Sequence, residues 1–384
     1  MKTWMPVLVL LTLAAMPALG RDVPMIRTMR VPDGGIQPQV AAQGDTIHLI
    51  YFTGDPKAGD VNYARSTDGG RTFAKAIRVN SEPASALAVG TVRGPRMAVG
   101  KDGRVHVAWM GSDRATPRGP GNSVPMLYTR LNDAGDAFEP QRNIIAEHPG
   151  LDGGGTVAAD ERGNVYVVWH APGKAKEESE QGRVVWVAPS TDEGKTFAPE
   201  HRFNRDDAGV CACCNLDAYI DPRGALLVLY RTASERVHRD IHVARMSFDD
   251  GRGAETTVDH LEVGICVMST ASMARRATDT VAAWERRGEV LVSALDANGQ
   301  ISLPLVPIGT GNNRKHPRLA VNKLGQTLVV WTEDTSWNKG GSIAWQLLDK
   351  TLKPVGPIGN ARGLPTWGTA AVFPTSDGRF TIIY

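Results

Sequence analysis

Gly163-Asn164-Val165-Tyr166-Val167-Val168-Trp169 decides the fold, because its layout returns along the whole chain. The layout is a turn that holds Gly or Asp, a strand of alternating residues and a closing aromatic residue, as also in Gly103–Trp109 and Gly378–Tyr384. Seven aromatic residues mark the repeats: Tyr51, Trp109, Trp169, Tyr230, Trp284, Trp331 and Tyr384. They are separated by 58, 60, 61, 54, 47 and 53 residues. A period of about 50 residues with strand-type alternation inside it predicts an all-β propeller.

The first hairpin of each repeat has nearly constant length. Counting back fourteen residues from the aromatic reaches the start of the hairpin in six repeats, at Pro95, Gly155, Leu216, Thr270, Pro317 and Ala370, and thirteen residues reach Pro38 in the first. The hairpin 368–384 has no chain after it, and the segment 24–31 has no hairpin before it. We therefore predict seven blades, with the N-terminal strand completing the last blade and closing the ring, so that no sheet edge stays exposed. Six blades, with the last hairpin packed differently, is the alternative.

The first twenty residues have the character of a secretory signal. Lys2 precedes a run that is almost wholly apolar from residue 4 to 19, and small residues at Ala18-Leu19-Gly20 suit cleavage before Arg21. The run is short for a membrane anchor and Pro17 interrupts it, so a membrane span is the weaker alternative. We expect residues 21–384 to form a single β-propeller domain that is exported to the periplasm or the extracellular space, without a membrane span in the mature chain.

The charge balance excludes some partners. Lysine and arginine number 43 against 41 aspartates and glutamates, and the net charge of +2 does not suggest a nucleic-acid groove or an anionic membrane surface. We expect a monomer that does not bind nucleic acid.

A second repeated motif occupies the turn between the third and fourth strands. Ser66–Phe73 and Ser190–Phe197 share the pattern S-x-D-x-G-x-T-F, and weaker copies lie at 132–138 and 247–251. The aspartate accepts hydrogen bonds from its own turn, the glycine supplies a left-handed position, and the aromatic fills the gap between blades. In this motif the chain resembles the Asp-box proteins, or bacterial neuraminidase (BNR) repeat proteins, of the sialidase superfamily. The resemblance implies a β-propeller whose Asp-box turns lie on the face opposite the active site.

The resemblance also implies a set of catalytic residues, from which this chain departs. Sialidases hold the substrate carboxylate with three arginines and use a Tyr–Glu pair as nucleophile and an aspartate as acid. The place of the first arginine is Ile36-Gln37-Pro38 here, although Arg93-Gly94-Pro95 occurs in the next repeat and Arg231 follows a second strand. Lys315 or Arg314 is the only substitute for the third arginine, and no tyrosine occupies a rim position with a glutamate partner.

In a propeller the starts of the first strands and the ends of the second strands share one rim, at the mouth of the central channel. That register predicts a ligand-binding set on the rim: Arg93, His170, Arg231, Lys315 and His316. Asp152 and Glu285 are the candidate general acid and base. These residues favour a site for a glycan or a small acidic ligand, with glycoside hydrolysis as the enzymatic hypothesis, because guanidinium groups match carboxylates well.

The four cysteines fall at equivalent starts of adjacent blades. Cys211, Cys213 and Cys214 lie in GVCACCN and Cys266 lies in ICVMS. In an exported protein an even number of cysteines favours disulfides, and a bridge from Cys213 or Cys214 to Cys266 is less strained than one between the two neighbours. The alternative is a soft-metal site for copper or zinc, in which Met268 joins the thiolates.

Three function classes therefore remain open for this sequence. The first is a glycan-binding or glycan-hydrolysing propeller, the second is a metal- or thiol-dependent protein that uses the cysteine cluster, and the third is a non-catalytic interaction platform. The sequence alone predicts no certain cofactor.

Overall fold

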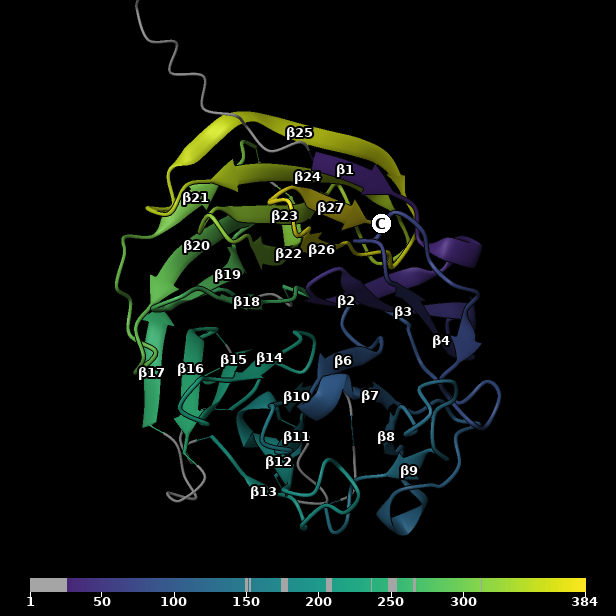
Figure 1. The fold of residues 1–384 in the computed structure, drawn as a ribbon. Helices are drawn as coiled ribbons and strands as arrows, with labels where there is room; N and C mark the ends of the chain where they lie inside the picture. Colours follow the sequence, from purple (N-terminus) through teal and green to yellow (C-terminus); the bar gives the residue numbers. More distant parts are fainter. Residues whose placement is uncertain are drawn as a thin grey trace, which may run out of the picture.

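Seven β-sheets form a closed ring around a central channel (Figure 1). The structure is a computed structural model that describes residues 26–148, 151, 153–173, 179–204, 209–235, 237–247, 254–264, 267–311 and 313–384. Six sheets have four strands and the seventh has three, which confirms the predicted seven-bladed propeller. Each four-stranded sheet follows chain order from one edge to the other, as repeats of consecutive hairpins require.

The first three blades take their strands from residues 36–202. Blade 1 holds β2 (Ile36–Gln43), β3 (Thr46–Asp55), β4 (Ala58–Ser66) and β5 (Ile77–Arg78). Blade 2 holds β6 (Arg96–Val99), β7 (Val105–Met110), β8 (Met126–Arg130) and β9 (Arg142–Asn143). Blade 3 holds β10 (Gly155–Ala159), β11 (Val165–Pro172), β12 (Arg183–Ser190) and β13 (His201–Arg202).

The next three blades repeat this arrangement. Blade 4 holds β14 (Asp217–Ile220), β15 (Leu226–Arg231), β16 (Ile241–Met246) and β17 (Ala254–Asp259). Blade 5 holds β18 (Ser272–Arg275), β19 (Thr280–Arg286), β20 (Glu289–Leu295) and β21 (Val306–Ile308). Blade 6 holds β22 (Arg314–Val321), β23 (Thr327–Glu333), β24 (Gly341–Leu348) and β25 (Pro354–Leu364).

The seventh blade joins the two ends of the described chain. Its strands are β26 (Ala371–Pro374), β27 (Phe380–Ile383) and the N-terminal β1 (Ile26–Met29). Strand β1 runs parallel to β27, with Ile26 opposite Phe380 and Met29 opposite Ile383. The pairing of β1 with β27 closes the ring, as predicted from the N-terminal segment that has no hairpin before it. It also covers the edge that β27 would otherwise expose.

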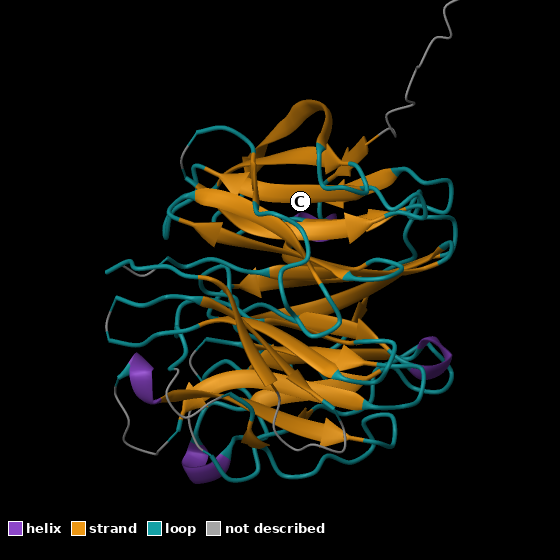
Figure 2. Cartoon of the chain, turned by 90° about the vertical axis from the view of Figure 1, so that its left-hand side faces the viewer, coloured by secondary structure: helices purple, strands orange, loops and turns teal. Residues whose placement is uncertain are grey.

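Helical structure within the described residues is limited to four short 3₁₀ segments (Figure 2). They are η1 (Pro32–Gly34), η2 (Lys101–Gly103), η3 (Pro120–Asn122) and η4 (Glu180–Gly182). None of the helices described is long and apolar enough to cross a membrane.

The repeated aromatic residues form the core between blades. Trp109, Trp169, Trp284 and Trp331 are at most 1% exposed, and each packs in a cluster that draws on two neighbouring sheets. Most of these aromatics do not end their strands: β3 continues to Asp55 and β11 to Pro172. The added residues pair with the third strand, which lengthens the hairpin toward one face of the ring.

The S-x-D-x-G-x-T-F turns are held by hydrogen bonds within each turn. Asp68 accepts from the backbone N–H groups of Arg71 and Thr72, and Ser66 Oγ accepts from Gly70 N. The second copy repeats this pattern at Asp192. The closing Phe197 meets Tyr128 of the neighbouring blade edge to face, with ring centroids 4.8 Å apart. These turns therefore join adjacent blades at their outer parts.

Candidate functional site

A ring of inner-strand starts surrounds the mouth of the channel. At four of them a residue other than glycine adopts a positive φ: Gln37 (52°), Met268 (45°), His316 (53°) and Trp367 (58°). A left-handed residue costs free energy outside glycine, so its recurrence at corresponding places of four blades marks a specialised segment.

Two adjoining cavities lie at this mouth. The larger has a volume of about 90 Å³ and is lined by Gly90–Arg93, Cys213, Met268 and Trp337. The smaller, of about 20 Å³, shares four of these residues and adds Lys315, His316, Thr335, Ser336, Trp367 and Gly368. Because the lining comes from blades 2, 4, 5, 6 and 7, the cavities must lie on the channel axis. Pockets that enclose a drug-sized ligand span about 300–1,000 Å³, so the mouth is nearly closed in this conformation.

The segment that closes the mouth is Ala88–Arg93, which we call the mouth loop. Gln37 Nε2 donates to the carbonyls of Ala88 and Gly90, at 2.8 Å each. On the far side Thr91 Oγ1 lies 3.0 Å from His316 Nε2. The loop thus connects blade 1 to blade 6 across the channel axis.

Cationic and aromatic side chains line the same mouth. Lys315 Nζ donates to the carbonyl of Val267 at 3.0 Å, and Arg93 Nη1 donates to the carbonyl of Val89 at 3.1 Å. Trp337 is 41% exposed, and its ring lies 6.1 Å from that of Trp367, edge to face. Among the described residues no tyrosine and no carboxylate lines either cavity.

His316 is buried beneath the mouth loop. Its backbone N–H donates to Ser269 Oγ, and its ring contacts Thr91. Burial, together with the positive charges of Lys315 and Arg318, lowers the pKa of His316 to about 3. The ring is therefore neutral at physiological pH and serves as a hydrogen-bonding group rather than a cation.

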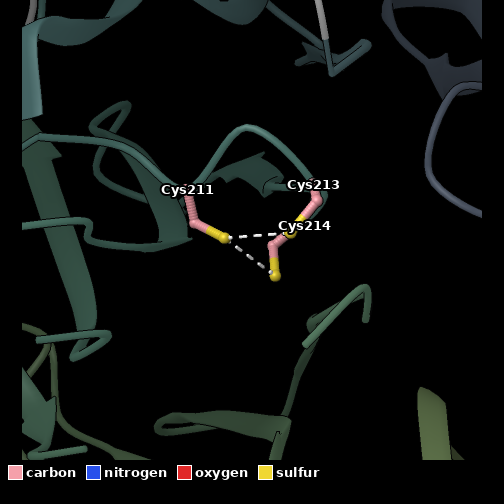
Figure 3. Close-up of side chains that lie close together, drawn as sticks. All are labelled: Cys211, Cys213 and Cys214. Carbon is pink, nitrogen blue, oxygen red and sulfur yellow. Dashed lines mark hydrogen bonds between the residues drawn. The ribbon is translucent and has the colours of Figure 1, made fainter. Parts of the chain in front are cut away.

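The side chains of Cys211, Cys213 and Cys214 lie close together (Figure 3), and Cys213 lines the larger cavity. Cys211 Sγ lies 3.4 Å from both Cys213 Sγ and Cys214 Sγ, and all three sulfurs lie within 4.8 Å of one another. Cys213 forms a disulfide, whereas Cys211 and Cys214 are free thiols that are 1% and 4% exposed. The partner of Cys213 lies outside the described residues, as does Cys266.

A buried ion pair lies directly behind these thiols. Arg231 Nη2 is 3.3 Å from Glu285 Oε2, and both side chains are almost fully buried. The other carboxylate oxygen of Glu285 accepts from Gly288 N. Burial raises the pKa of Glu285, while the charge of Arg231 acts in the opposite direction. Glu285 therefore contacts Arg231 and its own turn, and it lines neither cavity.

The two free thiols are hydrogen-bonded to each other. Cys211 donates its S–H to Cys214, and this hydrogen bond together with the charge of Arg231 lowers the pKa of Cys214 below its ordinary value. The same hydrogen bond and burial raise the pKa of Cys211. Cys214 is therefore the more acidic of the two thiols.

The structure brings most of the predicted rim residues together. Arg93, Lys315, His316, Met268 and Cys213 lie at the mouth. Arg231 and Glu285 lie behind Cys214, whereas His170 is fully buried, with Nε2 3.2 Å from the Cys214 carbonyl. Asp152 and Cys266 lie outside the described residues. Arg314, considered as a third arginine, donates to the carbonyl of Ile308 and lines neither cavity.

Sequence reasoning missed the mouth loop and both tryptophans. Trp337 lies in the polar turn D-T-S-W-N-K-G, where the sequence pattern gives no reason to expect a large aromatic residue to pack in the core. Trp367 directly precedes Gly368, a position that the repeat register does place on the rim. An unexplained tryptophan in a polar loop was therefore the available signal.

Three charged groups lie deeper in the channel and were also missed. Arg96 and Arg318 are 6% and 9% exposed, and they face Asp217, the one acidic group that acts on both of them. Burial lowers the pKa of each arginine and raises that of Asp217. Asp217 itself is half-buried, at the start of β14, the inner strand of blade 4.

A larger hollow of about 480 Å³ lies on the opposite face, between the first and last blades. It is lined by three arginines and three aspartates: Arg27, Arg71, Arg379, Asp45, Asp68 and Asp377. Their charges cancel, Arg379 pairs with Asp377, and Asp68 binds its own turn. This hollow belongs to the structural turns, so we place the candidate site at the mouth.

Known structures share the architecture. A protein of unknown function from Dyadobacter fermentans is 14% identical, with a TM-score of 0.53 over 78% of this chain and 90% of its own. An α-L-arabinanase from Penicillium chrysogenum, solved with arabinobiose, is 13% identical, with a TM-score of 0.53 over 84% and 95%. The NanB sialidase of Streptococcus pneumoniae is 9% identical, with a TM-score of 0.51 over 78% and 65%. No protein-family model and no curated protein sequence matches the chain. These likenesses establish the propeller fold that the chain shares with sialidases and arabinanases.

Proposed function

We propose that the channel mouth binds the acidic end of a glycan. The observation that carries this proposal is that Trp337 and Trp367 line the same cavity as Lys315, next to the cavity lined by Arg93. An exposed indole offers a flat apolar surface for a sugar ring, and a nearby cation favours a carboxylate. The glycoside hydrolases among the structures of similar fold support a glycan as the ligand class.

The nearly closed mouth requires the mouth loop to move when a sugar enters. The loop is held by two hydrogen bonds from Gln37, a hydrogen bond between Thr91 and His316, and the backbone bond from Ala88 N to the Pro56 carbonyl. Its displacement therefore costs less than the opening of a blade. If the site hydrolyses a glycan, we propose Asp152 as the general acid. Glu285 is the weaker candidate, because both of its carboxylate oxygens already accept hydrogen bonds, from Arg231 and from Gly288 N.

Binding is tested by titrating the protein with sialic acid, a uronic acid and a neutral arabino-oligosaccharide, with tryptophan fluorescence and calorimetry as readouts. We expect the acidic sugars to bind and the neutral one to bind more weakly. Trp337→Ala should abolish binding, whereas Leu324→Ala, at an exposed position among the turns, should not change it. Equal affinity of wild type and Trp337→Ala would refute the proposal. Turnover of sialosides and uronides, lost in Asp152→Asn and Arg93→Ala, would extend binding to hydrolysis.

A second function is favoured by the cysteine cluster. Three sulfurs within 4.8 Å of one another, two of them free thiols, suit thiol chemistry or a soft metal such as copper(I) or zinc. Met268 is on the adjoining cavity wall and is available as a further sulfur ligand. Counting free thiols under denaturing conditions and measuring bound metal tests this function. Two free thiols with bound metal would support a metal centre, and two free thiols without metal would support thiol chemistry.

A further inference from the structure

The three sulfurs of the cysteine cluster form a compact triangle in which Cys211 Sγ contacts both of the others. It lies 3.4 Å from the disulfide sulfur of Cys213 and 3.4 Å from the thiol of Cys214, and all three sulfurs lie within 4.8 Å of one another. Cys213 lines the cavity at the mouth, whereas Cys211 and Cys214 are buried. A disulfide in contact with a free thiol pair is the arrangement in which exchange needs no large movement.

The spacing and the hydrogen bonding suit that chemistry. Cys211 and Cys214 have the C-x-x-C spacing of dithiol redox motifs. The S–H of Cys211 donates to Cys214 Sγ at 3.4 Å, so a thiolate at Cys214 can take up that proton directly. Transfer of that proton to Cys214 turns Cys211 into the thiolate that faces the disulfide.

We infer that Cys211 is the exchanging sulfur of an internal relay, which moves a disulfide between the mouth-facing Cys213 and the buried pair Cys211–Cys214. This inference rests on the thiol function proposed above. It assigns a separate role to each sulfur, and it goes beyond a structural bridge.

The relay has two balanced steps. First, the Cys211 thiolate attacks Cys213 Sγ, so that a Cys211–Cys213 bond forms and the former partner of Cys213, for which we propose Cys266, leaves as a thiolate. The proton on Cys214 then passes to that leaving thiolate. Second, the Cys214 thiolate attacks Cys211 Sγ, which forms the Cys211–Cys214 disulfide and releases Cys213 as a thiolate. One disulfide is broken and one is made, so no external oxidant is needed.

The consequence is a reactive thiol at the channel mouth. In one state the mouth presents a disulfide and the buried pair is reduced. In the other state the buried pair is oxidised, and Cys213 is a free thiol beside Arg93 and Met268. A soft metal or an external disulfide that enters the mouth would meet this thiol only in the second state.

The test is native alkylation with iodoacetamide, followed by an acid quench and tryptic digestion without reductant. Trypsin places Cys211, Cys213 and Cys214 in the peptide 206–223 and Cys266 in the peptide 253–275. Before exchange the two peptides are joined. After exchange, 206–223 carries an internal disulfide and one carbamidomethyl group on Cys213, and 253–275 carries one on Cys266. We expect these separated peptides to accumulate in the wild type.

Two variants separate the steps. In Cys211→Ser the two peptides should stay joined, because the sulfur that attacks Cys213 Sγ is missing. Cys214→Ser should stop after the first step, with Cys266 alkylated and an internal Cys211–Cys213 bond. Circular dichroism confirms that each variant is folded. The relay would be overturned if the two peptides stayed joined in the folded wild type. It would also be overturned if Cys211 or Cys214 were alkylated while the two peptides remained joined. The count of two free thiols is measured independently, so loss of the thiol function itself gives a different result.

Discussion

Thr91 and His316 meet at the channel mouth, with Oγ1 and Nε2 3.0 Å apart although 225 residues separate them in sequence. Thr91 belongs to the mouth loop between blades 1 and 2, and His316 is the third residue of β22, the inner strand of blade 6. This contact holds the loop across the channel axis. It makes access to the candidate site depend on a few polar contacts.

Removing the Gln37 side chain should loosen the mouth loop. Gln37→Ala deletes both hydrogen bonds to the carbonyls of Ala88 and Gly90, which should cost about 1–3 kcal/mol of local stability. We expect faster amide hydrogen exchange in residues 88–93 and faster ligand association, with exchange elsewhere unchanged. Gln39→Ala is the matched control, because Gln39 Nε2 donates only to the adjacent Pro38 carbonyl. Equal exchange in the two variants would show that Gln37 does not hold the loop.

Replacing Arg231 should weaken the thiolate at Cys214. The guanidinium charge lowers the pKa of Cys214, so Arg231→Met should raise that pKa by about 1 unit. The thiolate absorbance near 240 nm, followed in a pH titration of the folded protein, should then appear at higher pH. Arg231→Lys keeps the charge and should stay close to the wild type. A titration midpoint that is the same in Arg231→Met and the wild type would contradict this assignment.

Buried histidines should make stability fall below neutral pH. Burial lowers the pKa of His106 and His316 to about 3 and that of His48 to about 4, whereas each titrates near 6.5 when unfolded. The unfolded state therefore binds more protons as pH falls from about 6.5 toward 4. Each histidine should remove about 1.4 kcal/mol per pH unit in this window, and the contribution is fully present above pH 7.

Urea unfolding at pH 7, 6 and 5 measures this loss. His106→Gln should reduce the slope by the share of one histidine, since glutamine can still bond Tyr128 and does not titrate. A slope for His106→Gln that equals that of the wild type would mean that folding does not lower the pKa of His106.

The charged groups inside the channel should depend on one another. Asp217→Asn keeps an oxygen for the Met273 N–H but leaves Arg96 and Arg318 without their shared acidic partner, at a cost of about 1–3 kcal/mol. Adding Arg318→Met should recover part of this loss, because it removes one of the two repelling charges. The free energy of unfolding in urea is to be measured for the single and the double variant. A double variant that is less stable than Asp217→Asn alone would contradict the coupling.

The architecture could be predicted because its signals are local and repeated. Each repeat carries an aromatic such as Trp169 in or directly after its second strand, and one repeat needs only its neighbours to bury that side chain. Because the N-terminal strand had no hairpin of its own, its place beside the last hairpin of the chain could also be predicted. The turn motif around Asp68 forms its hydrogen bonds within one turn, so the pattern is sufficient to predict them.

The candidate site could be predicted only in part. The repeat register placed Arg93, Lys315, His316 and the cysteines on one rim, because equivalent positions of successive blades face the same opening. It could not predict the course of the mouth loop, since Ala88–Arg93 has no periodicity. Nor could it predict that Trp337 would line the cavity, since an irregular turn sets its direction.

The sequence by itself determined the seven-bladed ring and its closing strand, because alternation and aromatic spacing are properties of neighbouring residues. Only the tertiary structure decided which cysteine sulfur contacts both of the others and how far the mouth is closed. Both depend on contacts between blades, such as Thr91 with His316 and Arg231 with Glu285, that no short stretch of chain encodes.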